Sequence, residues 1–178
     1  MTAWQEEVLG FWFGLDPERW WRADPALDAE IGERFLALWE KQRENLPEAF
    51  LGSPRDAVAA VVLFDQFPRN MHRGHADQFS TDPLALAVAR GAVERGLDDA
   101  MSPAERGFLY MPFQHSENIG DQNRSVALFT ALGDEYQLGY AIKHRDVIER
   151  FGRFPHRNAI LGRPPRPAEI DAGDVVPW

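Results

Sequence analysis

Small polar residues followed directly by proline recur along the chain and mark the starts of helices. The pairs are Asp24 with Pro25, Ser53 with Pro54, Asp82 with Pro83, and Ser102 with Pro103. A short polar side chain caps the free N–H groups of a first helical turn, and proline suits the next position because it has no N–H to satisfy. Ser102 is followed three residues later by Glu105, which completes a capping box.

The spacing of apolar residues predicts helices after each of these pairs. No segment alternates apolar and polar residues between hairpin turns, so strands are not expected. We therefore expect an all-α fold of antiparallel helical hairpins, joined by short connections and stacked in a layered or solenoid arrangement. The expected helices cover residues 3–13, 25–45, 54–66, 82–96, 103–111, 121–132 and 134–151, with short helical turns after 155 and 167.

The composition is that of a single soluble domain. Of 178 residues, 44% are hydrophobic and 26% charged, so we expect residues 1–178 to form one domain, with the proline-rich segment 164–178 packed on it and Trp178 holding that tail. The chain has no cysteine, which excludes disulfides and thiol chemistry. The start "MTAWQEEVLGFWFG" does not resemble a signal peptide, and no apolar run approaches ~18 residues, so we expect a cytoplasmic protein that does not enter a membrane.

Positive charge is concentrated in one segment of an acidic chain. The net charge of −9 disfavours nucleic acid as a partner, because phosphate backbones would be repelled. Residues 141–166 are the exception, since they hold seven basic residues against two acidic ones, a balance of +5 that leaves −14 for the remainder. A local anion site is therefore compatible with the overall charge.

Two segments share one frame of aromatic, proline and polar residues: "FDQFPRN" at 64–70 and "FGRFPHRN" at 151–158. In each, we expect the proline to end the preceding helix and the chain to turn sharply, because a residue before proline avoids the α region. Asn70 and Asn158 are expected to bond their own backbone, which is a structural role that needs no ligand. Arg153, His156 and Arg157 add surplus positive charge that suits a carboxylate or phosphate.

The first of these segments follows the run "AVAAVVLF", which is apolar on every side and is therefore expected to be surrounded by other helices. Asp65 and Gln66 come next and are expected to be buried as well. A buried carboxylate is costly unless a cation pairs with it. The candidate partners are Arg69 and Arg73 nearby, or Arg150, Arg153 and Arg157 from the second segment, which would bring the two segments together.

Histidines provide three further candidates. In "YMPFQHSENIGDQNRS", residues 110–125, Pro112 is expected to interrupt an apolar helix, and His115 and Glu117 follow as a candidate acid/base pair or as groups that only satisfy local hydrogen bonds. His144 shares a helical face with apolar residues and is expected in the core. His72 and His75 lack the further ligands of a metal site.

Sequence motifs leave the activity open. The chain has no glycine-rich phosphate loop, G-x-S-x-G, H-E-x-x-H or Glu-x-x-His pattern, so neither a metal nor a cofactor is expected. The aromatic residues of "FWFGLDPERWW" are assigned to the core at Phe11 and Trp12 at least.

The segments "VLGFWFG", "LFDQFPRNMHRG", "FLYMPFQHSE" and "RFGRFPHRNAILGR" resemble, in residues, order and spacing, the bacterial family known as domain of unknown function 924. The resemblance extends over about residues 7 to 170. It implies an all-helical fold akin to tetratricopeptide-repeat (TPR) proteins and no assigned activity. A TPR-like fold alone says nothing about the function of particular residues.

Two functional hypotheses remain, and whether the protein is an enzyme is open in both. In the first, a pocket binds a small anionic molecule, and His115 or Glu117 moves a proton. In the second, a TPR-like adaptor binds an acidic peptide or protein in an open groove. A purely structural role for both segments is the third possibility. The candidate ligand-binding residues are Asp65, Gln66, Arg69, Asn70, Arg153, His156, Arg157 and Asn158.

Overall fold

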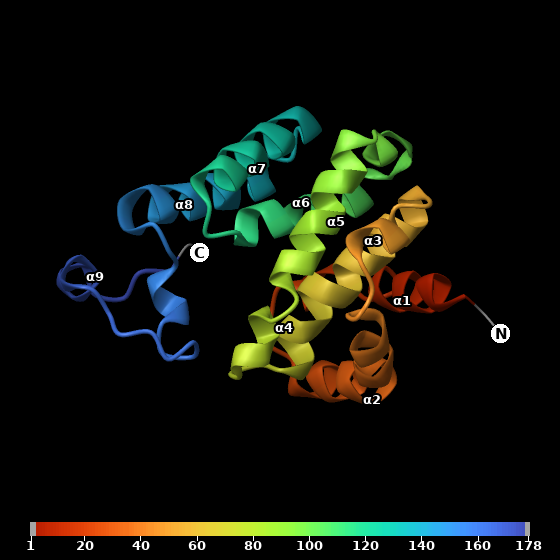
Figure 1. Ribbon diagram of the computed structural model, residues 1–178, viewed down its shortest axis with the longest axis horizontal. Coiled ribbons are helices and arrows are strands. Elements are labelled where there is room, and N and C mark those ends of the chain that lie inside the picture. Colours follow the sequence, from red (N-terminus) through yellow and green to blue (C-terminus); the bar gives the residue numbers. More distant parts are fainter. Residues whose placement is uncertain (1–2, 177–178) are drawn as a thin grey trace. The chain divides into compact units, whose positions relative to one another are not determined.

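The computed structural model describes residues 3–176, which form helices and turns with no strand among them (Figure 1). The prediction of an all-α protein is confirmed. The chain divides into two compact units at the bond between Leu109 and Tyr110, and each unit is described by itself. A single domain and a stacked, repeat-like arrangement stay predictions.

The N-terminal unit contains the longer series of helices. Its α-helices are α1 (Trp4–Trp12), α2 (Pro25–Gln42), α3 (Pro54–Val61), α4 (Phe67–Met71), α5 (Asp82–Glu94) and the first half of α6 (Pro103–His115). A π-helical segment, η3 (Val62–Gln66), joins α3 to α4, and the 3₁₀ turns are η1 (Pro17–Trp20), η2 (Pro47–Phe50), η4 (Ala76–Phe79) and η5 (Leu97–Ala100).

Three of the four expected caps are present. The Asp24 carboxylate accepts from the N–H groups of the first turn of α2, and Ser53 accepts from the first turn of α3. Ser102 and Glu105 exchange side-chain-to-backbone hydrogen bonds at the start of α6, as a capping box requires. Asp82 is the exception, because it is the first residue of α5 and its carboxylate instead forms an ion pair with Arg69.

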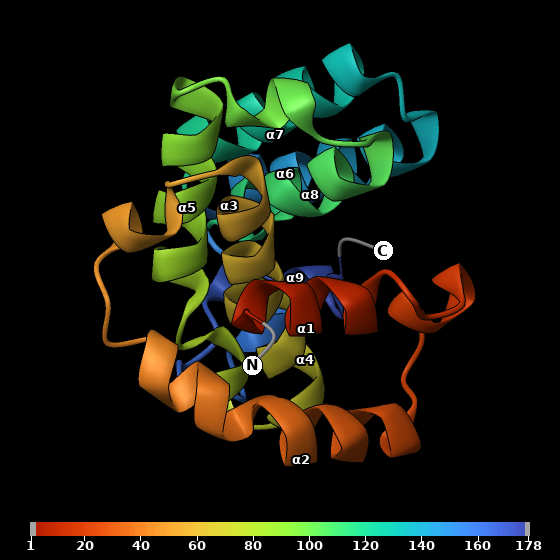
Figure 2. The same cartoon turned by 90° about the vertical axis from the view of Figure 1, so that its right-hand side faces the viewer.

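Helix α3 lies at the centre of this unit, with α1 and α5 packed against it (Figures 1 and 2). Every residue from Ala57 to Phe64 is fully buried, so the expectation drawn from "AVAAVVLF" is confirmed. The rings of Phe11 and Trp12 reach this core, where both contact Phe67.

The prediction of a sharp turn at Pro68 is wrong, because the helix continues from Pro54 to Met71 through the π segment. Proline cannot donate the hydrogen bond that the Phe64 carbonyl would receive in an α-helix. The Thr81 hydroxyl donates to that carbonyl at 2.7 Å and itself accepts from Trp39 Nε1 at 3.2 Å. A side chain from another part of the unit thus replaces the missing backbone donor.

The C-terminal unit consists of the rest of α6, α7 (Ile119–Leu132), α8 (Glu135–Phe151), the turn η6 (Pro155–Arg157) and α9 (Pro167–Ala172). Helix α6 runs through Pro112 to His115, so the expected interruption at Pro112 is wrong. Helices α7 and α8 pack together and are joined by Gly133, which has a left-handed φ of 75°, and by Asp134. A side chain at Gly133 would strain that short connection.

The segment after α8 folds back on this unit. Gly152 ends α8 with φ 70°, and Ala172 and Val175 pack against a cluster formed by Val147, Ile148, Phe151 and Phe154. Trp178, which was expected to hold the tail, lies outside the described residues.

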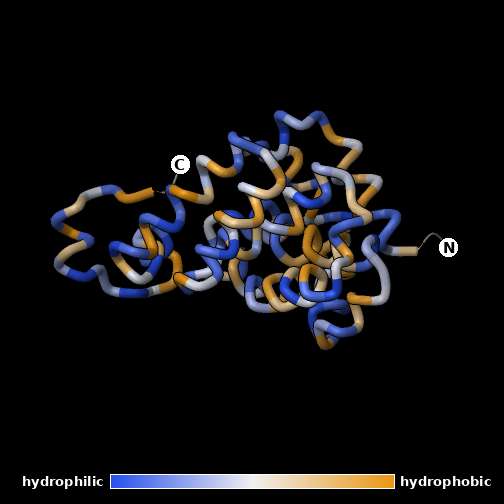
Figure 3. The backbone as a smooth tube through the Cα atoms, turned by 90° about the horizontal axis from the view of Figure 1, so that it is seen from above, coloured by the Kyte–Doolittle hydropathy of each residue, from blue (hydrophilic) through white to orange (hydrophobic). Residues whose placement is uncertain are grey.

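Apolar and polar segments alternate along the backbone in short runs (Figure 3). None of the helices within residues 3–176 combines the length and the apolar character that a membrane-spanning helix needs.

Candidate functional site

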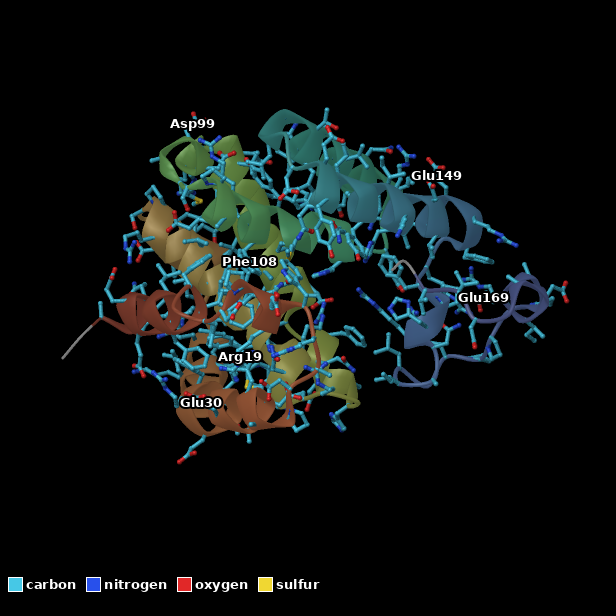
Figure 4. All side chains as sticks on the ribbon, turned by 180° about the vertical axis from the view of Figure 1, so that it is seen from behind. Arg19, Glu30, Asp99, Phe108, Glu149 and Glu169 are labelled. Atoms are coloured by element: carbon cyan, nitrogen blue, oxygen red, sulfur yellow. The ribbon has the colours of Figure 1, made fainter. Side chains whose placement is uncertain are left out.

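Glu169 in α9 is the centre of a hydrogen-bonded clasp that holds the segment after α8 (Figure 4). Arg153 Nε and Nη2 donate to its carboxylate at 2.6 and 2.8 Å, Asn158 Nδ2 donates at 2.9 Å, and the backbone N–H of Arg166 donates at 2.8 Å. These hydrogen bonds lower the pKa of Glu169 to about 2, and the bond from Arg153 makes the largest contribution. Asn158 was expected to bond its own backbone, and that expectation is wrong because its amide joins the clasp.

Glu117 anchors the other side of the same segment. Arg163 donates to both carboxylate oxygens, at 2.6 and 3.0 Å, and the backbone N–H of Phe154 donates at 2.7 Å. Burial by itself would raise the pKa of Glu117, but the hydrogen bonds from Arg163 and Phe154 outweigh it and the pKa is lowered. An ionised Glu117 carboxylate that accepts hydrogen bonds on both oxygens fits a structural role. The acid/base role predicted for Glu117 with His115 stays a prediction.

A second group of side chains lies at Phe154 and beside it and is termed here the basic cluster: His115, His144, His156 and Arg157. The His115 and His144 ring centroids are 6.3 Å apart, and the Phe154 ring lies 5.5 Å from His144 and 5.6 Å from His156. The Arg157 guanidinium carbon lies 4.5 Å from the centroid of the Phe154 ring. Two imidazoles and one guanidinium therefore lie against one buried aromatic ring, and a third imidazole, that of His115, lies beside His144.

His144 is the most buried imidazole of the basic cluster, with 6% of its surface exposed. Burial, followed by the nearby His115, Arg157 and His156, lowers its pKa to about 3. Its Nδ1 lies 2.8 Å from the Tyr140 carbonyl oxygen, so the neutral ring carries its proton on Nδ1 and donates it there. His144 is thus a buried neutral histidine, as expected from its helical face.

In the N-terminal unit, Asp65 is fully buried in the π segment. Gln66 Nε2 donates to its carboxylate, and Arg69 Nη2 lies 3.8 Å from Oδ1. The guanidinium of Arg69 approaches Asp82 more closely, with two contacts of 2.8 and 2.9 Å. Burial would lower the pKa of Arg69, but Asp82 and Asp65 raise it. The prediction that a nearby arginine pairs with Asp65 is confirmed for Arg69.

The other nearby candidates have different partners. Arg73 donates to the Asp28 carboxylate at 2.7 and 2.9 Å. Asn70 Nδ2 donates to the Gln66 carbonyl at 3.1 Å, so the expected local bond to backbone is present. Arg73 and Asn70 thus have their partners within the N-terminal unit.

Sequence reasoning missed several residues of this network. Arg163 was counted only as part of the basic segment, and Glu169 was not singled out. The spacing of Glu169 three residues after Arg166, with Pro167 between them, is that of a helix start and offered a usable signal. Nothing local in the sequence connects Arg163 with Glu117.

An open hollow of about 570 Å³ lies in the N-terminal unit, between α1, the segment after it and α2. Figure 4 labels two of the side chains that line it, Arg19 and Glu30. None of the predicted ligand-binding residues lines this hollow. Across residues 3–176, no group of three or more histidine, aspartate or glutamate side chains is placed to hold a metal ion.

These features define an all-helical protein with a basic cluster in its C-terminal unit. The chain belongs to the family described as bacterial protein of unknown function DUF924, whose profile matches residues 8–172. The family resemblance seen in the sequence is confirmed. The chain is also similar to the solved structure of the protein of unknown function ATU0120 from Agrobacterium tumefaciens, with 40% identity, a TM-score of 0.86 and coverage of 94% of this chain and 95% of that one. No curated protein matches the chain.

Proposed function

We propose that the basic cluster binds a small anionic molecule through a carboxylate or phosphate group. The observation that carries the proposal is the gathering of His144, His156 and Arg157 around Phe154, with His115 beside His144. Arginine donates charge-assisted hydrogen bonds to such oxygens, and an imidazole donates to them through an N–H group. The site uses two of the residues selected from "FGRFPHRN", namely His156 and Arg157, together with His115.

Other predicted residues support the cluster indirectly. Arg153 and Asn158 bind Glu169, and Glu117 binds Arg163, so these groups hold the backbone from which His156 and Arg157 extend. Two of the carboxylates in this unit thus have arginine partners outside the cluster. Asp65, Gln66, Arg69 and Asn70 form hydrogen bonds and ion pairs within the N-terminal unit, and a ligand role for them rests on the sequence pattern alone.

Calorimetric titration with inorganic phosphate and with citrate tests this site. We expect the wild type to bind at least one of them and His156→Gln to weaken that binding about tenfold or more. Arg150→Gln is the matched control, because Arg150 is an exposed arginine of α8 whose loss changes the net charge without touching the cluster. Equal loss of affinity in both variants would mean that only net charge matters, and the absence of binding to the wild type would remove the proposal.

The second candidate function is a TPR-like adaptor for an acidic peptide. The packed pair α7 and α8, joined by two residues, is the kind of helical hairpin from which such repeats are built. Titration with a short polyglutamate peptide separates the two hypotheses. An adaptor would bind the peptide with unchanged affinity in the presence of saturating phosphate, whereas a single anion site would show competition.

A further inference from the structure

The open hollow in the N-terminal unit has two walls with complementary chemistry. Helix α1 and the residues after it supply Gly10, Phe11 and Leu15, which are apolar, together with the carboxylate of Glu7. Helix α2 supplies Glu30 and Arg34, and η1 supplies Arg19, whose guanidinium is already bound by the Asp24 carboxylate at 2.8 Å. The volume of about 570 Å³ falls within the range typical of sites for small molecules.

Arg34 is held more loosely than the arginines of this unit that pair closely with a carboxylate, such as Arg55. Its nitrogens lie 3.4 Å from Glu30 and 3.9 Å from Glu7, whereas Arg55 meets Glu6 at 2.6 Å. Charge-assisted hydrogen bonds are normally about 2.7–2.9 Å long, so neither contact of Arg34 is a full one. The guanidinium lies over the Phe11 ring, 4.5 Å from its centroid, and 40% of the side chain is exposed. Arg34 is thus positioned by stacking and can still receive a carboxylate.

The two glutamates beside Arg34 are similarly accessible. The Glu7 side chain is 50% exposed and that of Glu30 is 47% exposed. A simple anion that bound Arg34 would approach both carboxylates and be repelled by them. A ligand that carries a positive group next to its negative one avoids this repulsion. The charges of the hollow therefore favour a zwitterion.

The α1 side of the hollow leaves space for an apolar group. A Cβ placed on Gly10 would meet no atom within 4 Å, so nothing fills the space above this helical glycine. Phe11 and Leu15 border the same space. Burial of an apolar side chain there would add about 25 cal/mol for each Å² removed from water.

We propose that this hollow binds a free α-amino acid with an apolar side chain. The α-carboxylate would bind Arg34, the α-ammonium would bind Glu7 or Glu30, and the side chain would lie over Gly10 against Phe11 and Leu15. In an α-amino acid the nitrogen and the carboxylate oxygens are about 3 Å apart, from bond lengths. This separation is comparable to the 3.4–3.9 Å between the Arg34 nitrogens and the glutamate oxygens. The site is independent of the basic cluster, because all its residues lie in the N-terminal unit.

Binding of leucine to the full chain, measured by ligand-observed NMR and calorimetry, tests the proposal. Two analogues probe the charges: N-acetyl-leucine lacks the ammonium group, and leucine amide lacks the carboxylate. We expect leucine to bind at millimolar concentration and each analogue to bind at least tenfold more weakly. An N-acetyl-leucine affinity equal to that of leucine would overturn the zwitterion assignment, as would the absence of leucine binding.

Two variants locate the site. Gly10→Leu places a side chain in the open space of the hollow and favours the helix, so it should abolish binding without lowering the melting temperature. Gly139→Leu is the matched control, because Gly139 is a helical glycine of α8 whose added Cβ also meets nothing within 4 Å. Arg34→Gln should weaken leucine binding without weakening the binding of leucine amide, because the amide has no carboxylate for Arg34 to bind and its ammonium still faces both glutamates. Retention of leucine binding in Gly10→Leu would place the ligand elsewhere and refute the proposal.

Discussion

Acid should destabilise this protein through His144, and replacement of that residue should remove the effect. His144 has a pKa of about 3 in the folded chain, first because it is buried and then because His115, Arg157 and His156 lie near it. In the unfolded chain a histidine titrates near 6.5. Between these two values the unfolded chain binds the proton and the folded chain does not, so stability falls as the pH falls from 6.5 towards 3.

The size of the effect follows from the two pKa values. Each unit of pH below 6.5 removes about 1.4 kcal/mol until the folded group itself titrates. Between pH 7 and pH 5 the wild type should therefore lose about 2 kcal/mol of unfolding free energy through this residue. His144→Gln cannot bind the proton and should lack that contribution, although it has a lower stability at pH 7 because the packing against Phe154 changes.

Urea titration followed by far-ultraviolet circular dichroism at pH 5, 6 and 7 measures the difference. Tryptophan fluorescence is unsuitable, because the described tryptophans all lie in the N-terminal unit. His75→Gln is the control for loss of a histidine, since that imidazole is 71% exposed. An NMR titration in which the His144 imidazole protonated near pH 6.5 would refute the reasoning, as would equal pH slopes for the wild type and His144→Gln.

Three further perturbations test the network around the helices. Thr81→Val should lower the unfolding free energy by about 1–3 kcal/mol in urea titration, because it leaves the Phe64 carbonyl and Trp39 Nε1 buried without their hydroxyl partner; an unchanged midpoint would contradict the role assigned to that bond. Glu169→Gln should speed hydrogen exchange in residues 153–172, because the clasp loses its charge, and exchange in α5 serves as the reference. Ser102→Ala should lower the free energy of unfolding by about 1 kcal/mol, because it removes the capping box of α6. A thermal unfolding curve identical to that of the wild type would show that the capping box does not stabilise the protein.

Local signals in the sequence located most helices and several of their partners. The caps at Asp24, Ser53 and Ser102 act within three residues, so the sequence alone identifies them. The run "AVAAVVLF" indicated a central helix for a similar reason, since burial on every side follows from composition on every side. The pairing of Asp65 with Arg69, four residues apart on one helix, was within reach of the same reasoning.

Proline was the main source of error. Pro68 and Pro112 were expected to end or interrupt helices, and in both places the helix continues. The missing N–H of Pro68 is compensated at the Phe64 carbonyl by Thr81, which is distant in sequence. A rule based on neighbours in the sequence cannot include a donor that only packing brings close.

The sequence by itself determined the helical class, the family and the segments in which the basic residues lie, because periodicity, caps and composition act over a few neighbouring residues. Only the tertiary structure decided which charged side chains pair with one another. Arg153 is bound by Glu169 and Arg163 by Glu117, contacts that span 16 and 46 residues. His144 and His156 meet at Phe154 only because the chain folds back after α8, and His115 joins them through its contact with His144. Charge pairing depends on distances of a few ångströms, and such distances between remote residues are set by packing.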